Sequence, residues 1–420
     1  MHEREGQKLQ RLRRLIADVA GRNEFYSRRL RRANVTPELC SLSEFCERMP
    51  FTHKGELAAD QRETPPYGRN LTYPLEEYTR FSQTSSTSGT PLVWLDTHES
   101  WSWMLGNWRR VLEGSGVTAA DRVYFAFSFG PFIGFWTGFE AAVHMGCLCI
   151  PGGTPSSSSR LLSMIAARAT VLCCTPTYAL RLAEVASGEG IDLSEASVRR
   201  IIVAGEPGGS QDNVRSRISK MWNGAEVFDH YGMTEVGAAA YQDAEQPGML
   251  RMVDEEFIVE VIDPESGREA ELGEIGEIVL TPLGRAASPV IRYRTGDLVR
   301  PVMTDRPGGP RRLGLAGGII GRTDEVVVVR GVNVYPSAVL DIVHGLPDVV
   351  EHKATLSESR SCTELELEVE LRAGADAEKV TRQLETKLRA ALALRIPVRV
   401  APPGLLPRSE MKANRWPRVR

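Results

Sequence analysis

The chain has 420 residues, 42% of them hydrophobic, and its 51 Lys and Arg nearly balance 54 Asp and Glu, which gives a formal net charge of −3. A chain of this size can bury a large core in about two or three domains. The near-neutral charge gives no support for nucleic acid or an anionic membrane surface as a partner.

The sequence also lacks the marks of a membrane or secreted protein. Its apolar stretches are interrupted before the ~18 residues of a membrane span, and the opening residues, MHEREGQK, lack the apolar core of a signal peptide. The seven cysteines contain no C-x-x-C pair, which is typical of free thiols in a reducing compartment. We therefore predict a soluble, cytoplasmic protein.

Three patterns of hydrophobicity follow a short helical start at residues 1–50. From about residue 90 to 240, apolar runs alternate with helical segments, which predicts βαβ crossovers and a mostly parallel sheet. From about 250 the chain becomes β-rich with frequent turns, which predicts an antiparallel subdomain. After Asp324, alternating helix and strand patterns predict a small α+β domain. The predicted fold class is therefore α/β, with a large N-terminal domain and a small C-terminal one.

One loop is unusually rich in hydroxyl groups. The segment 82–91, SQTSSTSGTP, consists mainly of Ser, Thr and Gly. Such clusters are usually solvated loops, but backbone N–H groups and small hydroxyls also form phosphate cradles. The sequence contains no G-K dipeptide, G-x-G-x-x-G, G-x-S-x-G or H-E-x-x-H, so the common nucleotide, hydrolase and zinc motifs do not decide between these interpretations.

Five other turns combine Gly with an ionisable or hydroxyl side chain. They are AGEPGGS (204–210), DHYGMTE (229–235), YRTGDL (293–298), GRTDEVVVVRGVNVYP (321–336) and LLPRSEMK (405–412). Each has a plain structural explanation, but their order resembles the core motifs of the adenylate-forming acyl-CoA synthetase superfamily. The chain length, FYSRRL near the start, PFTHKGEL (50–57) and the AGEP turn are similar to its phenylacetate–CoA ligase branch. The resemblance covers nearly the whole chain.

This resemblance implies that the hydroxyl-rich loop holds the β- and γ-phosphates of ATP. The residues concerned are Thr84, Ser85, Ser86, Thr87, Ser88 and Gly89. The family usually has Gly at the position of Ser86 and Lys at the position of Thr90, so a weaker grip on pyrophosphate is expected. Lys54 of PFTHK is a candidate for supplying positive charge from another segment.

The remaining ATP-binding roles also follow from the resemblance. Tyr231 would stack on adenine, the catalytic Thr234 would touch the α-phosphate, and the catalytic Glu235 would hold Mg²⁺, which takes one or two carboxylates together with phosphate oxygens. Asp297 would accept both ribose hydroxyls, as an acceptor-only carboxylate can, and Arg322 would contact ribose or phosphate. The other implied ATP contacts are Gly205, Glu206, Pro207, Asp229 and Gly232.

The resemblance further implies two domains, residues 1–323 and a mobile 324–420, with Asp324 at the hinge. The mobile domain would swing the catalytic Lys412 into the site, although the family prefers Gly where Met411 stands. The implied reaction activates a carboxylic acid to an acyl-adenylate and then forms a thioester with coenzyme A, releasing AMP and pyrophosphate.

The segment 127–142 is rich in Phe, Trp and Gly, a composition that is more often core than pocket. In the resembling branch it lines the acyl pocket, so Phe132, Ile133 and Trp136, with Gly205, become candidates for binding an aryl or arylacetic acid. Two alternatives stay open: transfer to a carrier-protein thiol or an amine, and a nucleotide-binding homologue without catalysis. A homodimer is expected only by analogy.

Overall fold

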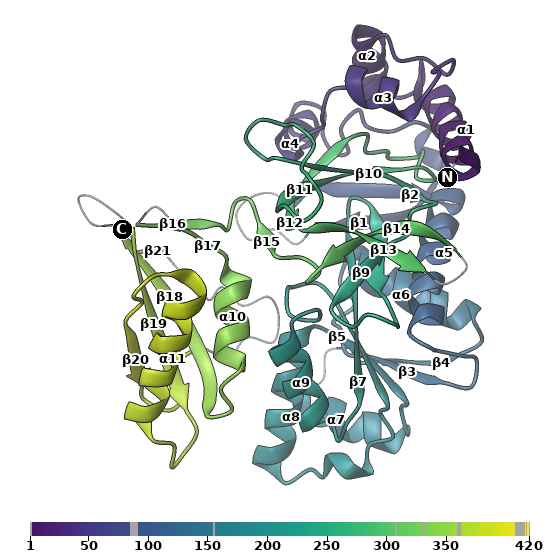
Figure 1. Ribbon diagram of the computed structural model, residues 1–420. Helices are drawn as coiled ribbons and strands as arrows, with labels where there is room; N and C mark the ends of the chain where they lie inside the picture. The colour runs from purple at the N-terminus through teal and green to yellow at the C-terminus, as the bar shows by residue number, and fades with distance from the viewer. Residues whose placement is uncertain are drawn as a thin grey trace.

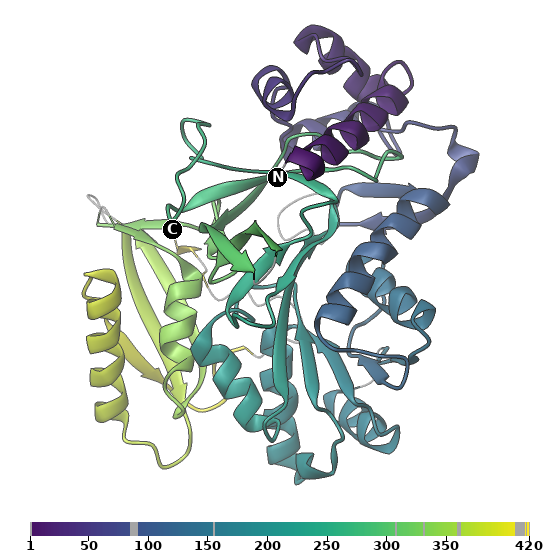
Figure 2. The same cartoon turned by 45° about the vertical axis from the view of Figure 1, so that its right-hand side comes forward.

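The computed structural model describes residues 2–84, 91–153, 156–306, 309–330, 332–358, 363–407, 416 and 418–419. Figure 1 shows a helical N-terminal end above a central sheet, with the C-terminal unit beside helix α9; Figure 2 shows the same arrangement after a 45° turn. Among the described helices, none combines the length and apolar character that crossing a membrane requires.

Four helices form the N-terminal end: α1 (His2–Val19), α2 (Glu24–Ala33), α3 (Leu42–Arg48) and α4 (Lys54–Glu63). Side chains of Asn23 and Ser41 cap α2 and α3 by accepting hydrogen bonds from backbone N–H groups in the first turn. The apolar faces of α1 to α3 form one buried cluster that also contains Ile258 and Ile291. The helical end is therefore joined to the β-rich middle of the chain.

A nine-stranded mixed sheet forms the centre of the molecule. Five strands are parallel, in the order β7 (Glu226–Met233), β6 (Arg200–Val203), β5 (Val171–Cys174), β3 (Arg122–Phe125) and β4 (Leu148–Pro151). The accompanying helices are α5 (His98–Gly114), α6 (Ile133–His144), α7 (Ser157–Ala166), α8 (Pro176–Glu189) and α9 (Asp212–Met221), with short 3-10 turns at Leu75–Glu77 and Leu193–Glu195. The predicted βαβ arrangement is confirmed.

The antiparallel strands are divided between this sheet and a second one. Strands β8 (Gly237–Gln242), β9 (Met249–Met252), β14 (Gly309–Ala316) and β13 (Pro301–Arg306) extend the large sheet beyond β7. Strands β10 (Phe257–Ile262), β11 (Gly276–Pro282), β12 (Tyr293–Val299) and β15 (Gly321–Arg322) form a separate four-stranded sheet, and β1 (Tyr78–Gln83) pairs with β2 (Val93–Thr97). The β-rich region is thus not one continuous subdomain.

The C-terminal unit has the α+β pattern expected from the sequence. Its elements are β16 (Val327–Val329), β17 (Val332–Val334), α10 (Pro336–His344), β18 (Val349–Glu358), β19 (Thr363–Leu371), α11 (Ala377–Leu392), β20 (Val398–Ala401) and β21 (Arg418–Val419). Its buried cluster, which includes Val334, Leu367 and Leu384, contains none of the described residues before Val327. The unit therefore has a hydrophobic core of its own.

The C-terminal unit lies beside α9 in Figure 1 and Figure 2, and polar contacts join the two. The Asn213 Nδ2 group donates to the backbone oxygen and to the carboxylate of Asp341, both at 3.2 Å. Arg217 donates to the Val349 carbonyl at 2.8 Å and lies 3.2 Å from Nδ1 of His344. Side-chain hydrogen bonds therefore contribute directly to this contact.

The loop at residues 283–292 is held tightly between β11 and β12. Its backbone carbonyls at Ala286, Ala287 and Pro289 accept hydrogen bonds from side chains of the segment 70–78, at 2.6 to 2.9 Å. A Cβ added to Gly284 would lie only 2.2 Å from Cδ1 of the Trp103 indole. The close approach of this loop to α5 therefore requires glycine at position 284.

Replacing Gly284 by alanine should consequently destabilise the fold. We expect Gly284→Ala to lower the free energy of unfolding by about 1–3 kcal/mol, because the indole must move to admit the methyl group. Gly188→Ala in α8 is the matched control, since its Cβ would meet no atom within 4 Å; it should be neutral or stabilising by up to about 1 kcal/mol. Urea denaturation measures both, and equal effects would contradict the prediction.

Candidate active site

Residues from several of the sequence motifs lie at the carboxyl ends of the parallel strands or bond to residues there. The turn from Gly205 to Pro207 follows β6, and the segment 229–235 forms the end of β7 and its turn into β8. Asp297 lies on β12 directly opposite Arg322 on β15. In open α/β sheets the carboxyl ends of the strands are where ligands bind, so this edge is the candidate site.

Asp297 links three of these strands. Its Oδ2 accepts a 2.7 Å hydrogen bond from the Tyr231 hydroxyl, and its Oδ1 accepts one of 2.8 Å from Nη1 of Arg322. Nε of Arg322 also donates to Asp324 at 3.0 Å. A carboxylate offers about four lone-pair positions and can accept several donors at once, which suits a group implied to bind sugar hydroxyls.

The titration of this group follows from burial and charge. Burial, together with the adjacent Asp297 carboxylate, raises the pKa of Tyr231 well above its ordinary value. Burial lowers the pKa of Arg322, but Asp297 and Asp324 outweigh that effect and the pKa is raised. Tyr231 therefore stays a hydrogen-bond donor and Arg322 stays a cation over any physiological pH.

Glu235 lies buried in the turn between β7 and β8. Its Oε1 accepts a hydrogen bond of 3.3 Å from the Tyr293 hydroxyl and lies 3.7 Å from Nζ of Lys54, the first residue of α4. Lys54 is about half exposed, whereas Glu235 is buried. The candidate lysine and the candidate magnesium ligand are therefore neighbours, although 181 positions separate them in the chain.

A magnesium ion fits this donor set only together with a phosphate ligand. Among the described residues, no group of three or more His, Cys, Asp or Glu side chains is arranged to hold a metal. Mg²⁺ is usually held by one or two carboxylates plus substrate phosphates, and Glu235 supplies one carboxylate oxygen facing the site cation Lys54. Glu235 would then bind the ion and the nucleotide would complete its coordination.

The two ends of the hydroxyl-rich loop are fixed to each other. The Thr84 N–H donates to the Leu92 carbonyl at 2.9 Å, and the Leu92 N–H donates to the Thr84 hydroxyl at 3.0 Å. Thr84 is buried at the end of β1. The loop candidates Ser85, Ser86, Thr87, Ser88 and Gly89, with Thr90, lie outside the described residues, and so do Met411 and Lys412.

The AGEP turn and Asp229, the first residue of the DHYGMTE motif, are held by hydrogen bonds to neighbouring residues. Glu206 accepts the Thr177 N–H at 2.7 Å, which caps α8, and Gly205 has φ +92°, a left-handed conformation that favours glycine. Asp229 accepts the Ser210 hydroxyl at 2.6 Å in a buried position. These contacts fix the turn beside the implied nucleotide, but they do not themselves identify a ligand.

The aromatic candidates occupy the start of α6. Trp136 is 40% exposed and donates from Nε1 to the Gly130 carbonyl at 3.0 Å, while Ile133 is buried in the large core cluster. Phe132 is partly buried at the position before the helix. Phe129, which sequence analysis did not single out, packs edge-on against Trp136, with ring centroids 5.1 Å apart, and has φ +52°. A bulky residue in that conformation is unusual.

The chain matches two family profiles. The AMP-binding enzyme profile matches residues 81–283, and the AMP-binding enzyme C-terminal domain profile matches residues 331–418. The phenylacetate-coenzyme A ligase of Pseudomonas putida is 29% identical over 416 residues, which are 96% of this chain and 92% of the relative. That of Aromatoleum evansii is 30% identical over 313 residues, which are 73% of this chain and 67% of the relative.

The chain belongs to the adenylate-forming acyl-CoA synthetase superfamily, in its phenylacetate–CoA ligase-like branch. The predicted family is thereby confirmed. Among solved structures, 2-hydroxyisobutyryl-CoA ligase in the postadenylation state, in complex with 2-HIB-AMP, is 27% identical, covers 100% of this chain and 90% of its own, and gives a TM-score of 0.93. The same ligase in the thioesterification state gives 0.74.

Sequence reasoning missed several residues that hold this family site together. Tyr293 and Ser210 both lie in the quoted motifs YRTGDL and AGEPGGS, so the signal was present, but their partners Glu235 and Asp229 are distant in sequence. Asp96 and Arg285 gave no motif signal. They form a fully buried ion pair, and Arg285 also contacts the Thr234 carbonyl at 2.6 Å.

The buried neighbours Asp229 and His230 should oppose each other in the pH dependence of stability. Burial raises the pKa of Asp229 to about 7 and lowers that of His230 to about 4. The stability from the raised Asp229 pKa is complete below about pH 4 and is lost as the pH rises to about 7. The stability from the lowered His230 pKa is complete above about pH 6.5 and is lost as the pH falls to about 4.

Asp229→Asn removes the first effect and keeps an acceptor for Ser210. Its free energy of unfolding, relative to that of the unsubstituted protein, should therefore rise as the pH increases from about 4 to 7. Urea denaturation at several pH values in that window measures the difference. A difference that stays constant with pH would contradict the assignment of Asp229 as the titrating group.

Proposed function

We propose that the chain is an AMP-forming acid–CoA ligase, which activates a carboxylic acid with ATP and transfers the acyl group to coenzyme A, releasing AMP and pyrophosphate. The main support is that motif residues of this family pair with one another, Asp297 with Tyr231 and Arg322, and that the charges of Glu235, Asp297 and Arg322 all act on the Tyr293 hydroxyl. The full-length similarity to phenylacetate-coenzyme A ligases and to a 2-hydroxyisobutyryl-CoA ligase of known structure is consistent with this reaction.

The first step brings two anions together, because a carboxylate attacks the α-phosphorus of ATP. The site must therefore supply positive charge and positioning rather than acid–base chemistry. Magnesium bound at Glu235 would stabilise the developing charge on pyrophosphate. Lys54 is paired with Glu235 in this structure. Moving its ammonium group to a phosphate oxygen would leave the Glu235 carboxylate available to the metal.

The nucleoside would be held by the Asp297 group. The Asp297 carboxylate would accept the two ribose hydroxyls, and Arg322 beside it is a fixed cation for ribose or phosphate. Tyr231 would offer its ring to adenine, with Gly232 and the turn Gly205–Pro207 alongside. The buried hydrogen bond from Ser210 to Asp229 keeps that side of the site in one conformation.

The second step requires the C-terminal unit to move. We assign residues 1–323 to the domain that binds ATP and the acid, and residues 324–420 to a mobile domain that carries Lys412, with Asp324 as the hinge. The separate buried cluster of the C-terminal unit supports this division. So do the TM-scores of 0.93 and 0.74 against two states of one ligase, because the chain matches one arrangement better than the other.

The acid is proposed to be an aryl or arylacetic acid. Phe132 and Trp136 at the start of α6 and Phe129 beside them supply aromatic surface, and edge-to-face contacts suit a flat ring. The relatives are called phenylacetate-coenzyme A ligases. An ATP–pyrophosphate exchange assay with benzoic, phenylacetic, heteroaromatic and small branched acids tests this choice. No exchange with any acid would contradict the proposed function.

The acceptor separates the main proposal from its alternatives. Thioester formation with free coenzyme A supports the ligase, whereas exchange without turnover on coenzyme A would favour a carrier-protein thiol or an amine. Nucleotide binding without exchange would favour a non-catalytic homologue. The cytoplasmic location and a homodimer remain predictions, which fractionation and light scattering can test.

Lys54 should act on ATP rather than on the acid. We expect Lys54→Met to raise the KM for ATP about tenfold, which corresponds to the loss of about 1.4 kcal/mol in one charge-assisted contact, with little change in the KM for the acid. Lys220→Met on α9 is the control for the loss of one exposed lysine. Steady-state kinetics measure both, and an unchanged KM for ATP would remove Lys54 from the site.

Lys412 should be needed for only one of the two steps. Its proposed role is to bridge the incoming carboxylate and the α-phosphate, so Lys412→Ala should lose most acyl-adenylate formation. It should still convert supplied acyl-adenylate to thioester, because that step follows withdrawal of the lysine. Lys379→Ala on α11 is the control from the same domain. Adenylation at the wild-type rate by Lys412→Ala would show that the assignment is wrong.

A further inference from the structure

Arg285 and Asp96 form an ion pair that is shielded completely from solvent. Both side chains are 0% exposed, and the contact is bidentate, with Nε and Nη2 of Arg285 donating to the two Asp96 oxygens at 2.8 and 2.7 Å. The guanidinium also lies over the Trp94 ring, 5.1 Å from its centroid. This geometry suits the planar fork of arginine and cannot be reproduced by lysine.

The third nitrogen of the guanidinium does not contact Asp96 and instead bonds a residue of the candidate site. Nη1 of Arg285 donates to the backbone carbonyl of Thr234 at 2.6 Å. Thr234 precedes Glu235 in the turn between β7 and β8. One side chain therefore ties this turn to Asp96 on β2, the strand that follows the hydroxyl-rich loop.

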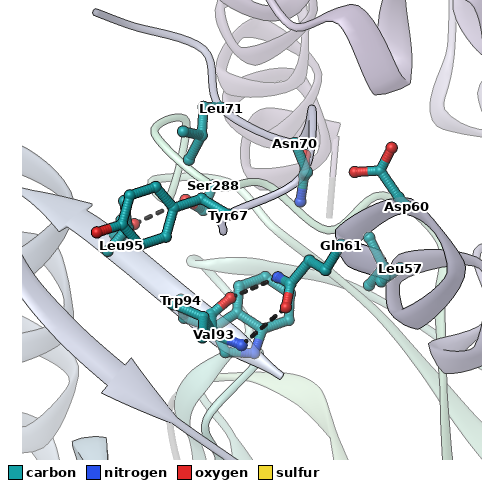
Figure 3. Close-up of a pocket in the computed structure, with 10 residues that line it drawn as sticks. All are labelled: Leu57, Asp60, Gln61, Tyr67, Asn70, Leu71, Val93, Trp94, Leu95 and Ser288. Atoms are coloured by element: carbon teal, nitrogen blue, oxygen red, sulfur yellow. Dashed lines mark hydrogen bonds between the residues drawn. The ribbon is translucent and has the colours of Figure 1, made fainter. Parts of the chain in front are cut away.

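Strand β2 is itself held from two sides, as Figure 3 shows. The Gln61 amide of α4 donates to the Val93 carbonyl at 2.7 Å and accepts the Val93 N–H at 3.0 Å. The Ser288 hydroxyl donates to the Leu95 carbonyl at 2.7 Å. The cavity between these groups measures only about 10 Å³, so it holds no more than a water molecule. Asp96 therefore has little freedom to follow a moving partner.

Arg285 is also fixed at its backbone. It follows Gly284, which packs against the Trp103 indole, and it lies in the loop 283–292, whose carbonyls are bound by the segment 70–78. Strand β2 with Asp96 and the backbone of Arg285 are thus anchored independently of each other. The guanidinium therefore fixes the distance between β2 and the turn that carries Thr234 and Glu235.

A buried ion pair is a poor device for stability alone. Taking both charges out of water costs several kcal/mol, and well-packed apolar residues of similar volume are often as stable or more so. Stability by itself therefore gives no reason for an arginine here, whereas the hydrogen bond to Thr234 does. Misplacing reacting groups by about 1 Å can lower a rate by about a hundredfold.

We propose that Arg285 is a positioning residue for adenylation, which holds Thr234 and Glu235 at a fixed distance from the strand that follows the hydroxyl-rich loop. The proposal rests on the proposed function, since the groups positioned are those implied to contact the α-phosphate and magnesium. Asp96 keeps the guanidinium in orientation, and Arg285 acts only through the Thr234 carbonyl.

The first test replaces the planar guanidinium of Arg285 by the ammonium group of lysine, which keeps the positive charge. Arg285→Lys should lower kcat for ATP–pyrophosphate exchange by about 10- to 100-fold, with less than a threefold change in the KM for the acid. Amide hydrogen exchange of a peptide covering residues 231–240 should also become faster without ligand.

Arg199→Lys is the matched control, because Arg199 pairs with Asp121 and a backbone carbonyl at the opposite edge of the sheet. The kcat of this variant should stay within twofold of that of the unsubstituted protein.

A second variant separates positioning from folding. The double substitution Asp96→Leu with Arg285→Met removes both charges and the bond to Thr234, so its unfolding midpoint should stay near that of the unsubstituted protein while kcat falls as in Arg285→Lys. A folded double variant with unchanged kcat would overturn the proposal, and so would Arg285→Lys if kcat and hydrogen exchange matched the Arg199→Lys control. If the unsubstituted protein shows no ATP–pyrophosphate exchange with any acid, the proposed function fails instead. The comparison of amide hydrogen exchange then still tests the contact between Arg285 and Thr234.

Discussion

The carboxylate of Asp297 connects the two sheets at the candidate site. Its two oxygens bind Tyr231 from the large mixed sheet and Arg322 from the last strand of the smaller sheet. Arg322 also donates to Asp324, three residues before β16, the first strand of the C-terminal unit. Because a buried carboxylate is tolerated only when it is paired and hydrogen-bonded, Asp297 requires these partners, and their bonds help to fix the relative position of the two sheets at this edge.

Much of this arrangement could be predicted from the sequence. The βαβ region, the α+β unit and the family followed from local hydrophobic patterns and from motifs whose residues lie within a few positions of one another. The nine-stranded sheet was less predictable, because β13 and β14 join β9 across more than fifty residues. No local pattern distinguishes a strand that pairs with its neighbour from one that joins a distant sheet edge.

The site shows the same limit on a smaller scale. Lys54 and Glu235 were named separately, but only the structure brings them within 3.7 Å. Arg285 and Asp96 had no signal at all, because a buried arginine looks in the sequence like any surface arginine in a loop. Phe129 was hidden for another reason: its left-handed backbone is uncommon for an aromatic residue and cannot be inferred from composition.

The contact between α9 and α10 has a thermodynamic consequence. It is made by amide, guanidinium and carboxylate groups such as those of Asn213, Arg217 and Asp341, and the apolar cluster of the C-terminal unit does not extend across it among the described residues. Separating such surfaces exposes little hydrocarbon, and water replaces each lost hydrogen bond at a net cost near 1 kcal/mol. For the domain movement proposed above, two orientations of the unit can therefore lie close in free energy, so that a small ligand that binds one of them more tightly would decide which one predominates.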